Sequence, residues 1–319
     1  MTYRIGFDVG GSKIAAALVQ ITGNSCRILS RQTKPFPLGR DGAFFAALLR
    51  EMAHDLEAAA PGAVPIQGVG LALPGSLDVG RGRVIHAHNL GFHDLPLLDL
   101  ARREFPGQTL SLINDARAAA LAELRVGALQ GCQTGVMLTL GTGVGGALIL
   151  QGRLHPGGRG LGTEPGHLLL HQGGRRCSCG NRGCAETDCS ATALIQAARR
   201  GLAAHRDSLI FQGCQGDKAR VNARLIAESA AAGDSWAAGL FGQWLEELSA
   251  LLASLVNLLD PEIIAIGGGL SACGDLLYPP LRRLTQEKSF FHSCGEIVPA
   301  RLGNEAGIIG AALAVEAVE

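Results

Sequence analysis

The sequence predicts an α/β protein that consists of two related halves and carries a structural zinc loop. A chain of 319 residues is long for a single hydrophobic core. A unit of strand, glycine turn and strand occurs twice, around Gly10–Gly11 and again around Gly141–Gly143. One histidine and three cysteines between residues 167 and 184 form a complete ligand set for zinc. These observations indicate two α/β halves, the second of which binds a metal.

The first half is predicted to alternate strands and helices, and its strands end at glycine or acidic residues. The apolar runs and their periodicity predict strands at 3–7, 14–19, 69–73 and 110–113, and helices at 44–56 and 116–126.

The second half repeats this pattern. Its expected elements are strands at 135–140, 144–150, 263–266 and 297–300, and helices at 191–200, 221–232, 235–259 and 307–318.

The zinc prediction depends on the spacing His167-x9-Cys177-x-Cys179-x4-Cys184. One imidazole and three thiolates fill a tetrahedral zinc site and leave no position for water or substrate, so the site is structural. The alternative is a disulfide and a spare thiol, but clustered cysteines in a reduced compartment favour metal. The remaining cysteines lack ligand spacing and are expected to be ordinary buried or half-buried thiols, namely Cys26, Cys132, Cys189, Cys214, Cys273 and Cys294.

Composition argues against several classes of partner. The 28 basic and 28 acidic residues balance, which is unlike the clustered positive charge of a nucleic-acid-binding surface. The longest apolar helix candidate, at 248–259, is too short to cross a bilayer. The first residues do not resemble a secretory signal, so we expect a cytoplasmic protein that binds neither membrane nor nucleic acid.

Three glycine turns follow predicted strands and are candidate sites for phosphate and nucleotide. Successive backbone N–H groups in such a turn can bind an anion, and an adjacent carboxylate can hold Mg²⁺. A plain hairpin turn is the alternative for any one of them, and the first turn matches neither the Walker nor the dinucleotide spacing. The candidates are Asp8, Gly10, Gly11, Ser12 and Lys13 in the first turn, Gly141, Thr142 and Gly143 in the second, and Gly267, Gly268 and Gly269 in the third, where bare backbone could admit a purine.

The chain resembles the ROK family of sugar kinases, in the actin-like ATPase superfamily, over essentially its whole length. The matching segments occur in family order, and the Cys-x-Cys-Gly-x-x-Gly-Cys-x-Glu signature is the most specific. They are 8–13, 73–75, 114–116, 141–146, 164–167, 177–186 and 267–269. The resemblance implies two ribonuclease H-like domains with an interdomain cleft, ATP and Mg²⁺ in that cleft, phosphorylation of a hexose, and a homodimer. We expect a smaller domain from 1–113 plus 302–319 and a larger one from 114–301 that carries the zinc loop.

Asp115 falls on the family's catalytic aspartate, which the resemblance implies is the general base for the sugar hydroxyl. On its residues alone, Asn114-Asp115 could simply cap the helix that follows. The resemblance assigns sugar contacts to Asn114, Glu164, His167 and Glu186, with Gly75 and Asn89 as further candidates. His167 would then contact both zinc and a sugar hydroxyl, one through each ring nitrogen. Asp8 would position Mg²⁺, and the first two glycine turns would approach the phosphates.

The expected reaction is phosphorylation of the 6-hydroxyl of glucose. Phe92 stands where several glucokinase-like members carry tryptophan, which favours this sugar. Other substrates that remain open are N-acetylglucosamine and N-acetylmannosamine, and then mannose or fructose. A non-catalytic sugar sensor is less favoured because Asp115 is present. A ROK transcription repressor is less favoured because only seven residues precede Asp8.

Overall fold

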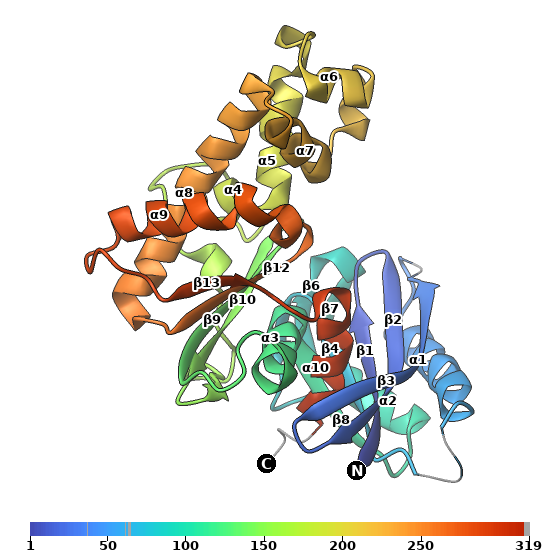
Figure 1. Cartoon of the computed structure of the whole chain (residues 1–319). Coiled ribbons are helices and arrows are strands. Elements are labelled where there is room, and N and C mark those ends of the chain that lie inside the picture. The colour runs from blue at the N-terminus through green and yellow to red at the C-terminus, as the bar shows by residue number, and fades with distance from the viewer. Residues whose placement is uncertain (37, 61, 63–64, 316–319) are drawn as a thin grey trace. The chain divides into compact units, whose positions relative to one another are not determined.

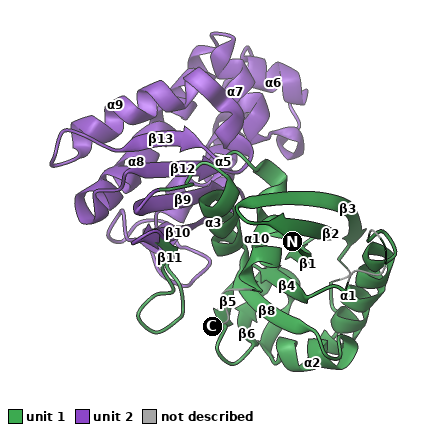
Figure 2. Cartoon of the chain, turned by 60° about the horizontal axis from the view of Figure 1, so that its bottom comes forward, with its two compact units in different colours: residues 1–131, 153–163, 301–319 green, residues 132–152, 164–300 purple. Residues whose placement is uncertain are grey.

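The computed structural model describes residues 1–36, 38–60, 62 and 65–315. The chain divides into two compact units, shown in different colours in Figure 2. Unit 1 consists of residues 1–131, 153–163 and 301–319, and unit 2 of residues 132–152 and 164–300. These packing units place 114–131 and 153–163 with the N-terminal residues, whereas the sequence-based boundary assigns them to the larger domain. Helix α3 (Asp115–Val126) belongs to unit 1 because it packs against α10 (Ala306–Ala314).

Unit 1 is built on a five-stranded sheet with the order β3-β2-β1-β4-β8. Its strands are β1 (Thr2–Val9), β2 (Lys13–Thr22), β3 (Ser25–Pro35), β4 (Gly68–Leu73) and β8 (Thr109–Asn114). β1 and β2 form an antiparallel hairpin, while β4 is parallel to both β1 and β8. The carboxyl ends of β1, β4 and β8 therefore meet at one edge of the sheet, which brings Asp8 and Asn114 to the same edge.

Helices cover both faces of this sheet (Figure 1). α1 (Gly42–Glu57) and α2 (Leu97–Glu104) share a core with the side chains of Ile5 and Phe7. The alternate residues on β1 and β4 face α10 and are small: a Cβ on Gly6 would lie 2.0 Å from the Ile308 carbonyl oxygen, and one on Gly70 would lie 1.8 Å from that of Ala311. Glycine is required at these positions because the helix backbone lies directly against the sheet. A separate small sheet is formed by β5 (Ser76–Asp78), β6 (Arg83–Ala87) and β7 (Phe92–Leu95).

The second sheet repeats the arrangement of the first, with the order β11-β10-β9-β12-β13. Its strands are β9 (Thr134–Leu140), β10 (Val144–Leu150), β11 (Arg153–Leu154), β12 (Ile263–Gly267) and β13 (Glu296–Pro299). β9 and β10 form an antiparallel hairpin, and β12 is parallel to both β9 and β13. The predicted duplication of strand, glycine turn and strand is confirmed, and it extends to the order of the whole sheet.

The helices of unit 2 share one large core with β9 and β12. The longest, α8 (Ser235–Leu259), begins at an N-cap in which Asp234 accepts the Ala237 N–H at 2.7 Å. The other α-helices of unit 2 in the described residues are α4 (Glu186–Cys189), α5 (Ala191–Gly201), α6 (Leu209–Cys214), α7 (Ala223–Ala231) and α9 (Tyr278–Lys288), and a 3-10 helix covers Gly269–Leu276. In the part of the chain that the structure describes, no helix combines the length and apolarity needed to span a membrane.

Every strand and helix expected from the sequence is present, with ends that shift by a few residues. The final helix was expected at 307–318; α10 covers Ala306–Ala314, and residues 316–318 lie outside the described residues. The patterns in the sequence did not predict β3, β11, the small sheet, α2, α4, α6 or α9. Strand β3 is an edge strand without a buried residue, so it lacks the apolar signal on which a strand prediction depends.

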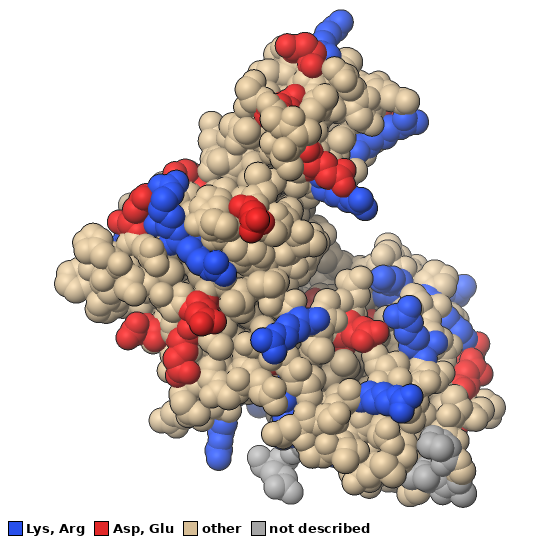
Figure 3. All heavy atoms as spheres, in the orientation of Figure 1, with Lys and Arg blue, Asp and Glu red and all other residues tan. Residues whose placement is uncertain are grey.

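Charged side chains of both signs are interspersed on the surface. On the face shown in Figure 3, lysine and arginine lie among aspartate and glutamate in each unit. Several exposed charges form ion pairs, such as Arg224 with Glu228 and Arg283 with Glu287, each at 2.7 Å. Such pairs contribute little to stability. The absence of a nucleic-acid partner stays a prediction.

Candidate functional site

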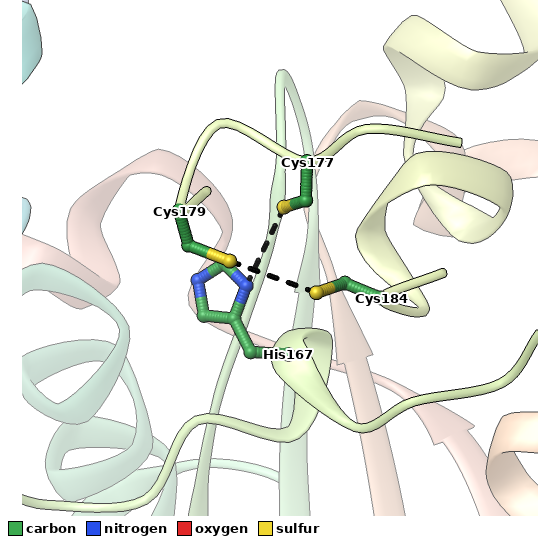
Figure 4. Close-up of side chains that lie close together, drawn as sticks. All are labelled: His167, Cys177, Cys179 and Cys184. Carbon is green, nitrogen blue, oxygen red and sulfur yellow. Dashed lines mark hydrogen bonds between the residues drawn. The ribbon is translucent and has the colours of Figure 1, made fainter. Parts of the chain in front are cut away.

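The four predicted zinc ligands lie together in unit 2 (Figure 4). His167 Nδ1 lies 3.7 Å from Cys177 Sγ, and Cys179 Sγ lies 3.6 Å from Cys184 Sγ. One ligand atom from each of the four residues falls within 4.8 Å of all the others. The three cysteines are thiols and form no disulfide, so the alternative of a disulfide plus a spare thiol is not adopted.

The donor set and its spacing fit a zinc ion. Sulfur and nitrogen ligands held about 2.0–2.3 Å from one tetrahedral ion lie about 3.3–3.8 Å from each other, which matches the two distances above. Burial raises the pKa of the Cys177 thiol, and it raises that of Cys184 to about 12. Metal binding must therefore displace protons from these sulfurs. His167 lies at the end of the short 3-10 helix Pro165–His167, and its N–H donates to the Glu164 carbonyl at 3.0 Å.

Glu186, two residues beyond Cys184, connects the zinc loop to the second glycine turn. It begins α4 and is half-buried. Its Oε2 accepts the backbone N–H of Val144 at 3.1 Å, and its Oε1 accepts the Ser178 hydroxyl at 3.2 Å. A predicted sugar contact therefore lies directly against the turn that is predicted to bind phosphate.

Two carboxylates gather at the edge of the unit 1 sheet. Asp8 lies near the end of β1, and Asp115 is the first residue of α3, directly after β8. Burial and, to a smaller extent, the negative charge of Asp115 raise the pKa of Asp8 to about 6, against the opposing positive charge of Lys13. Burial also raises the pKa of Asp115, against the opposing hydrogen bond that the Ala116 N–H donates to its Oδ1 at 2.8 Å. The two groups are close enough for their charges to interact.

Asn114 caps helix α3, as the residues alone suggested. Its Oδ1 accepts the Arg117 N–H at 3.2 Å, while its Nδ2 donates to the Gly75 carbonyl at 3.3 Å. Gly75 has a φ of +99°, and a Cβ there would lie 2.2 Å from the His86 carbonyl oxygen, so its backbone requires glycine whatever its role in binding. Asn114 therefore has a structural role that is independent of any sugar contact.

The first glycine turn closes through a hydrogen bond from the Gly10 N–H to the Lys13 carbonyl at 2.8 Å. Ser12 and Lys13 are exposed beyond it. A Cβ on Gly11 would lie 3.2 Å from the Asn89 backbone and side chain, which places Asn89 beside this turn. The structure thus brings the first turn, Asp8, Asn89 and Asp115 into one region of unit 1.

The remaining predicted residues lie in unit 2. Thr142 is exposed in the second turn, where the Gly141 N–H donates to the Gly143 carbonyl at 3.0 Å. Gly268 has a φ of +91°, and a Cβ there would lie 2.1 Å from the Leu140 carbonyl oxygen. The positive φ and the close contact with the neighbouring strand therefore explain why residue 268 is glycine. A purine site at 267–269 stays a prediction.

Two residues near the candidate sites were missed from the sequence. Ser178 stands between two predicted zinc ligands, and its hydroxyl donates a hydrogen bond to Glu186. Its position inside the Cys-x-Cys motif was the available signal. Gly307 lies at the start of α10, where a Cβ would lie 2.6 Å from Asp8 Oδ2. The available signal was a glycine in the first turn of an otherwise alanine- and isoleucine-rich helix.

Comparisons with known proteins extend over nearly the whole chain. The family model described as "ROK family" matches residues 4–318. A glucokinase from Thermotoga maritima is 34% identical over 97% of this chain and 95% of its own, and an N-acetylmannosamine kinase from Escherichia coli is 31% identical over 97% of both.

Solved structures are similar as well. The crystal structure of a ROK family glucokinase from Streptomyces griseus, in complex with glucose and AMPPNP, has a TM-score of 0.81 at 31% identity and covers 97% of this chain and 98% of that one. A ROK family transcriptional regulator has a TM-score of 0.86 at 26% identity, with 99% of this chain and 78% of that one covered. These matches confirm the predicted fold class of two actin-like ATPase domains, and this chain belongs to the ROK family.

Proposed function

We propose that this protein is an ATP-dependent sugar kinase that phosphorylates the 6-hydroxyl of glucose. Relatives named glucokinase are 34% and 33% identical over nearly the full chain, which supports a sugar kinase in general. The observation that carries the proposal is the pair of carboxylates, Asp8 and Asp115, at one edge of the unit 1 sheet. Phosphoryl transfer to a hydroxyl requires a base for the hydroxyl proton and a group to hold the metal that accompanies ATP.

Asp115 acts as the general base in this proposal. Its carboxyl lies at the carboxyl end of a strand, and burial raises its pKa above the ordinary value. A raised pKa makes a carboxylate a stronger proton acceptor near neutral pH, which suits it to take the proton of a sugar hydroxyl as the oxygen attacks phosphorus. The Ala116 N–H, bonded to Oδ1 at 2.8 Å, orients the group.

Asp8 and the glycine turns hold the nucleotide in this proposal. The carboxylate oxygens of Asp8 suit Mg²⁺, which when bound neutralises charge on the transferred phosphoryl group. Backbone N–H groups near Gly11 and Thr142 would contact phosphate, with Ser12 and Lys13 at the first turn. The bare backbone at 267–269 would lie against the base.

The sugar would contact the polar residues that the family resemblance assigns to it. They are Asn114, Glu164, His167 and Glu186, with Gly75 and Asn89 as further candidates. His167 Nδ1 faces the Cys177 sulfur, so Nε2 is the nitrogen available for a hydroxyl. Polar groups arranged for particular hydroxyls reject sugars that leave them unpaired.

The runner-up substrates are N-acetylated hexosamines. The 31% identical relative is named N-acetylmannosamine kinase, which supports this alternative directly. N-acetylglucosamine, mannose and fructose follow. The similarity to a transcriptional regulator supports a sugar-responsive repressor less well, because Asp115 retains the carboxylate of a catalytic base. We also propose that the protein is cytoplasmic and forms a homodimer. Light scattering of the purified protein would test the homodimer.

A coupled assay of ADP release with glucose, N-acetylglucosamine, N-acetylmannosamine, mannose and fructose tests the proposal. The highest kcat/KM is expected for glucose, with glucose 6-phosphate as the product. A clear preference for an N-acetylated hexosamine would overturn the choice of sugar. Failure to turn over any of the five would overturn the proposed activity.

A further inference from the structure

Val144, which directly follows the second glycine turn, is held from two sides by residues next to the zinc ligands. Its backbone N–H donates to Glu186 Oε2 at 3.1 Å. On its carbonyl side lies Gly166, where a Cβ would be 2.0 Å from the Val144 oxygen, so that segment packs directly against the strand. Gly166 immediately precedes the zinc ligand His167, and Glu186 follows the zinc ligand Cys184 by two residues. The turn is therefore bracketed by the two ends of the metal-binding segment.

The second oxygen of Glu186 reaches the zinc loop itself. Oε1 accepts the Ser178 hydroxyl at 3.2 Å and lies 3.5 Å from Cys177 Sγ. Ser178 stands between the ligands Cys177 and Cys179, so its position depends on both. One carboxylate thus joins the Cys-x-Cys loop to the backbone of the glycine turn through its two oxygens.

Other contacts around α4 strengthen this connection. The Ala191 N–H, just beyond α4, donates to the Gly141 carbonyl at 3.0 Å, which holds the start of the turn as Glu186 holds its end. Arg175, in the zinc loop, pairs with Asp188 of α4 at 3.2 Å. The Thr187 hydroxyl donates to the Cys184 carbonyl at 2.8 Å. The helix is only four residues long, so its position depends on these contacts rather than on its own hydrogen bonds.

We propose that Glu186 is a positioning residue that transmits the state of the zinc loop to the glycine turn at 141–144, so that zinc sets the affinity of the chain for nucleotide phosphate. This inference rests on the proposed function, which assigns that turn to phosphate. A turn whose backbone is already fixed loses less conformational entropy when it binds an anion, so binding is tighter when the zinc loop is folded. Loss of zinc would release Ser178 and Glu186, and the turn would lose its fixed conformation.

Gly143 provides a way to displace Glu186 without removing its carboxylate. A Cβ on Gly143 would lie 2.2 Å from Glu186 Oε2, so Gly143→Ala must push this oxygen away from the Val144 N–H. Ser178→Ala removes the hydrogen bond to Glu186 Oε1 and a long contact of 3.9 Å between the hydroxyl and Cys177 Sγ. Gly239→Ala is the matched control, because a Cβ at this position of α8 meets nothing within 4 Å.

The first measurement is hydrogen exchange of the wild-type backbone around 141–145, with zinc and after chelation. We expect faster exchange after chelation, since the Val144 N–H loses its acceptor. The second is titration with Mg·AMPPNP in the absence of sugar. Chelation should weaken binding about tenfold and Gly143→Ala about five- to tenfold, while Ser178→Ala should weaken it about two- to threefold. The Gly143→Ala protein should retain its zinc and should respond less to chelation than wild type, as coupled contacts do.

The inference is overturned if exchange around 141–145 and nucleotide affinity are both unchanged by chelation, or if Gly143→Ala binds nucleotide like Gly239→Ala. Because no sugar is present, these outcomes are independent of the sugar assay. A protein that turned over no sugar but lost nucleotide affinity in Gly143→Ala would retain the inference and lose the proposed activity. Glu164→Gln should weaken sugar binding while leaving nucleotide affinity unchanged.

Discussion

The first and second glycine turns both join the strands of an antiparallel hairpin, but they obtain their carboxylates differently. In unit 1, Asp8 and Ala15 form the second residue pair from the turn of the hairpin. In unit 2, Thr139 and Gly145 form the corresponding pair. The first turn therefore carries an acid in its own strand. The second has a hydroxyl residue there, and its acid is Glu186, which comes from a helix 42 residues further along than Val144.

This difference shows that the same arrangement of strands, present twice, can hold its two carboxylates in place by different means. An acid built into a strand is positioned by sheet hydrogen bonds, and it is present whenever unit 1 is folded. In our proposal Glu186, at the start of a short helix that follows the predicted zinc loop, keeps its position only while that loop is ordered. We therefore expect unit 1 to be sensitive to pH and packing, and unit 2 to be sensitive to metal.

The largest effect is expected at Asp115 in unit 1. Asp115→Asn removes the proposed base and should lower kcat by about 100- to 10,000-fold. Sugar binding, measured by calorimetry, should change little because the amide keeps the shape of the side chain. Asp99→Asn is the control, since Asp99 forms only an exposed pair with Arg102. A near-normal kcat for Asp115→Asn would show that another group is the base.

The metal dependence of unit 2 is tested by Cys184→Ser. Loss of this buried sulfur should reduce bound zinc from about one ion per chain toward none and should raise the KM for sugar about tenfold or more. Because burial raises the pKa of Cys184 to about 12, zinc affinity of the wild type should fall as pH is lowered. Elemental analysis and chelator competition measure both effects, with Cys273→Ser as the control. Full zinc content in Cys184→Ser would contradict the ligand assignment.

Packing distinguishes two glycines, one in the sheet of unit 1 and one in a helix of unit 2. Gly70→Ala in unit 1 would place a Cβ 1.8 Å from the Ala311 carbonyl oxygen and should lower the free energy of unfolding by about 1–3 kcal/mol. Gly242→Ala in α8 of unit 2 meets nothing within 4 Å and should instead stabilise by about 0.5–1 kcal/mol through its helix propensity. Denaturant unfolding of both variants gives the comparison, and equal destabilisation would refute the packing argument.

The smallest effect concerns the pH dependence of unit 1. Burial raises the pKa of Asp8 from 3.8 to about 6, so the folded state binds a proton more tightly than the unfolded state. The stability that this proton provides is present below pH 3.8 and is lost as pH rises through about 6. Asp8→Asn should therefore stabilise the metal-free protein by about 1–3 kcal/mol at pH 8 and by almost nothing below pH 4. A gain of the same size at both pH values would contradict the assigned cause.

Much of the fold follows from local patterns. Periodicity predicted the buried strands and the longer helices because their apolar residues repeat at the spacing of the structure that they form. Edge strand β3 and the small sheet escaped prediction because their exposed faces weaken that pattern. The zinc ligands were predicted from spacing alone because all three cysteines lie within eight residues, where the loop can close around one ion.

The sequence by itself determined the histidine and cysteine cluster that could bind zinc, the duplicated hairpins and the acidic residues at strand ends, since each is encoded within a short stretch of chain. Only the tertiary structure decided that Asp8 and Asp115 influence each other, and that Glu186 serves both the zinc loop and the turn at Val144. The interactions of Asp8 with Asp115 and of Glu186 with Val144 join residues 42 or more positions apart. Their partners are selected by sheet order and helix packing, which no local pattern in the sequence specifies.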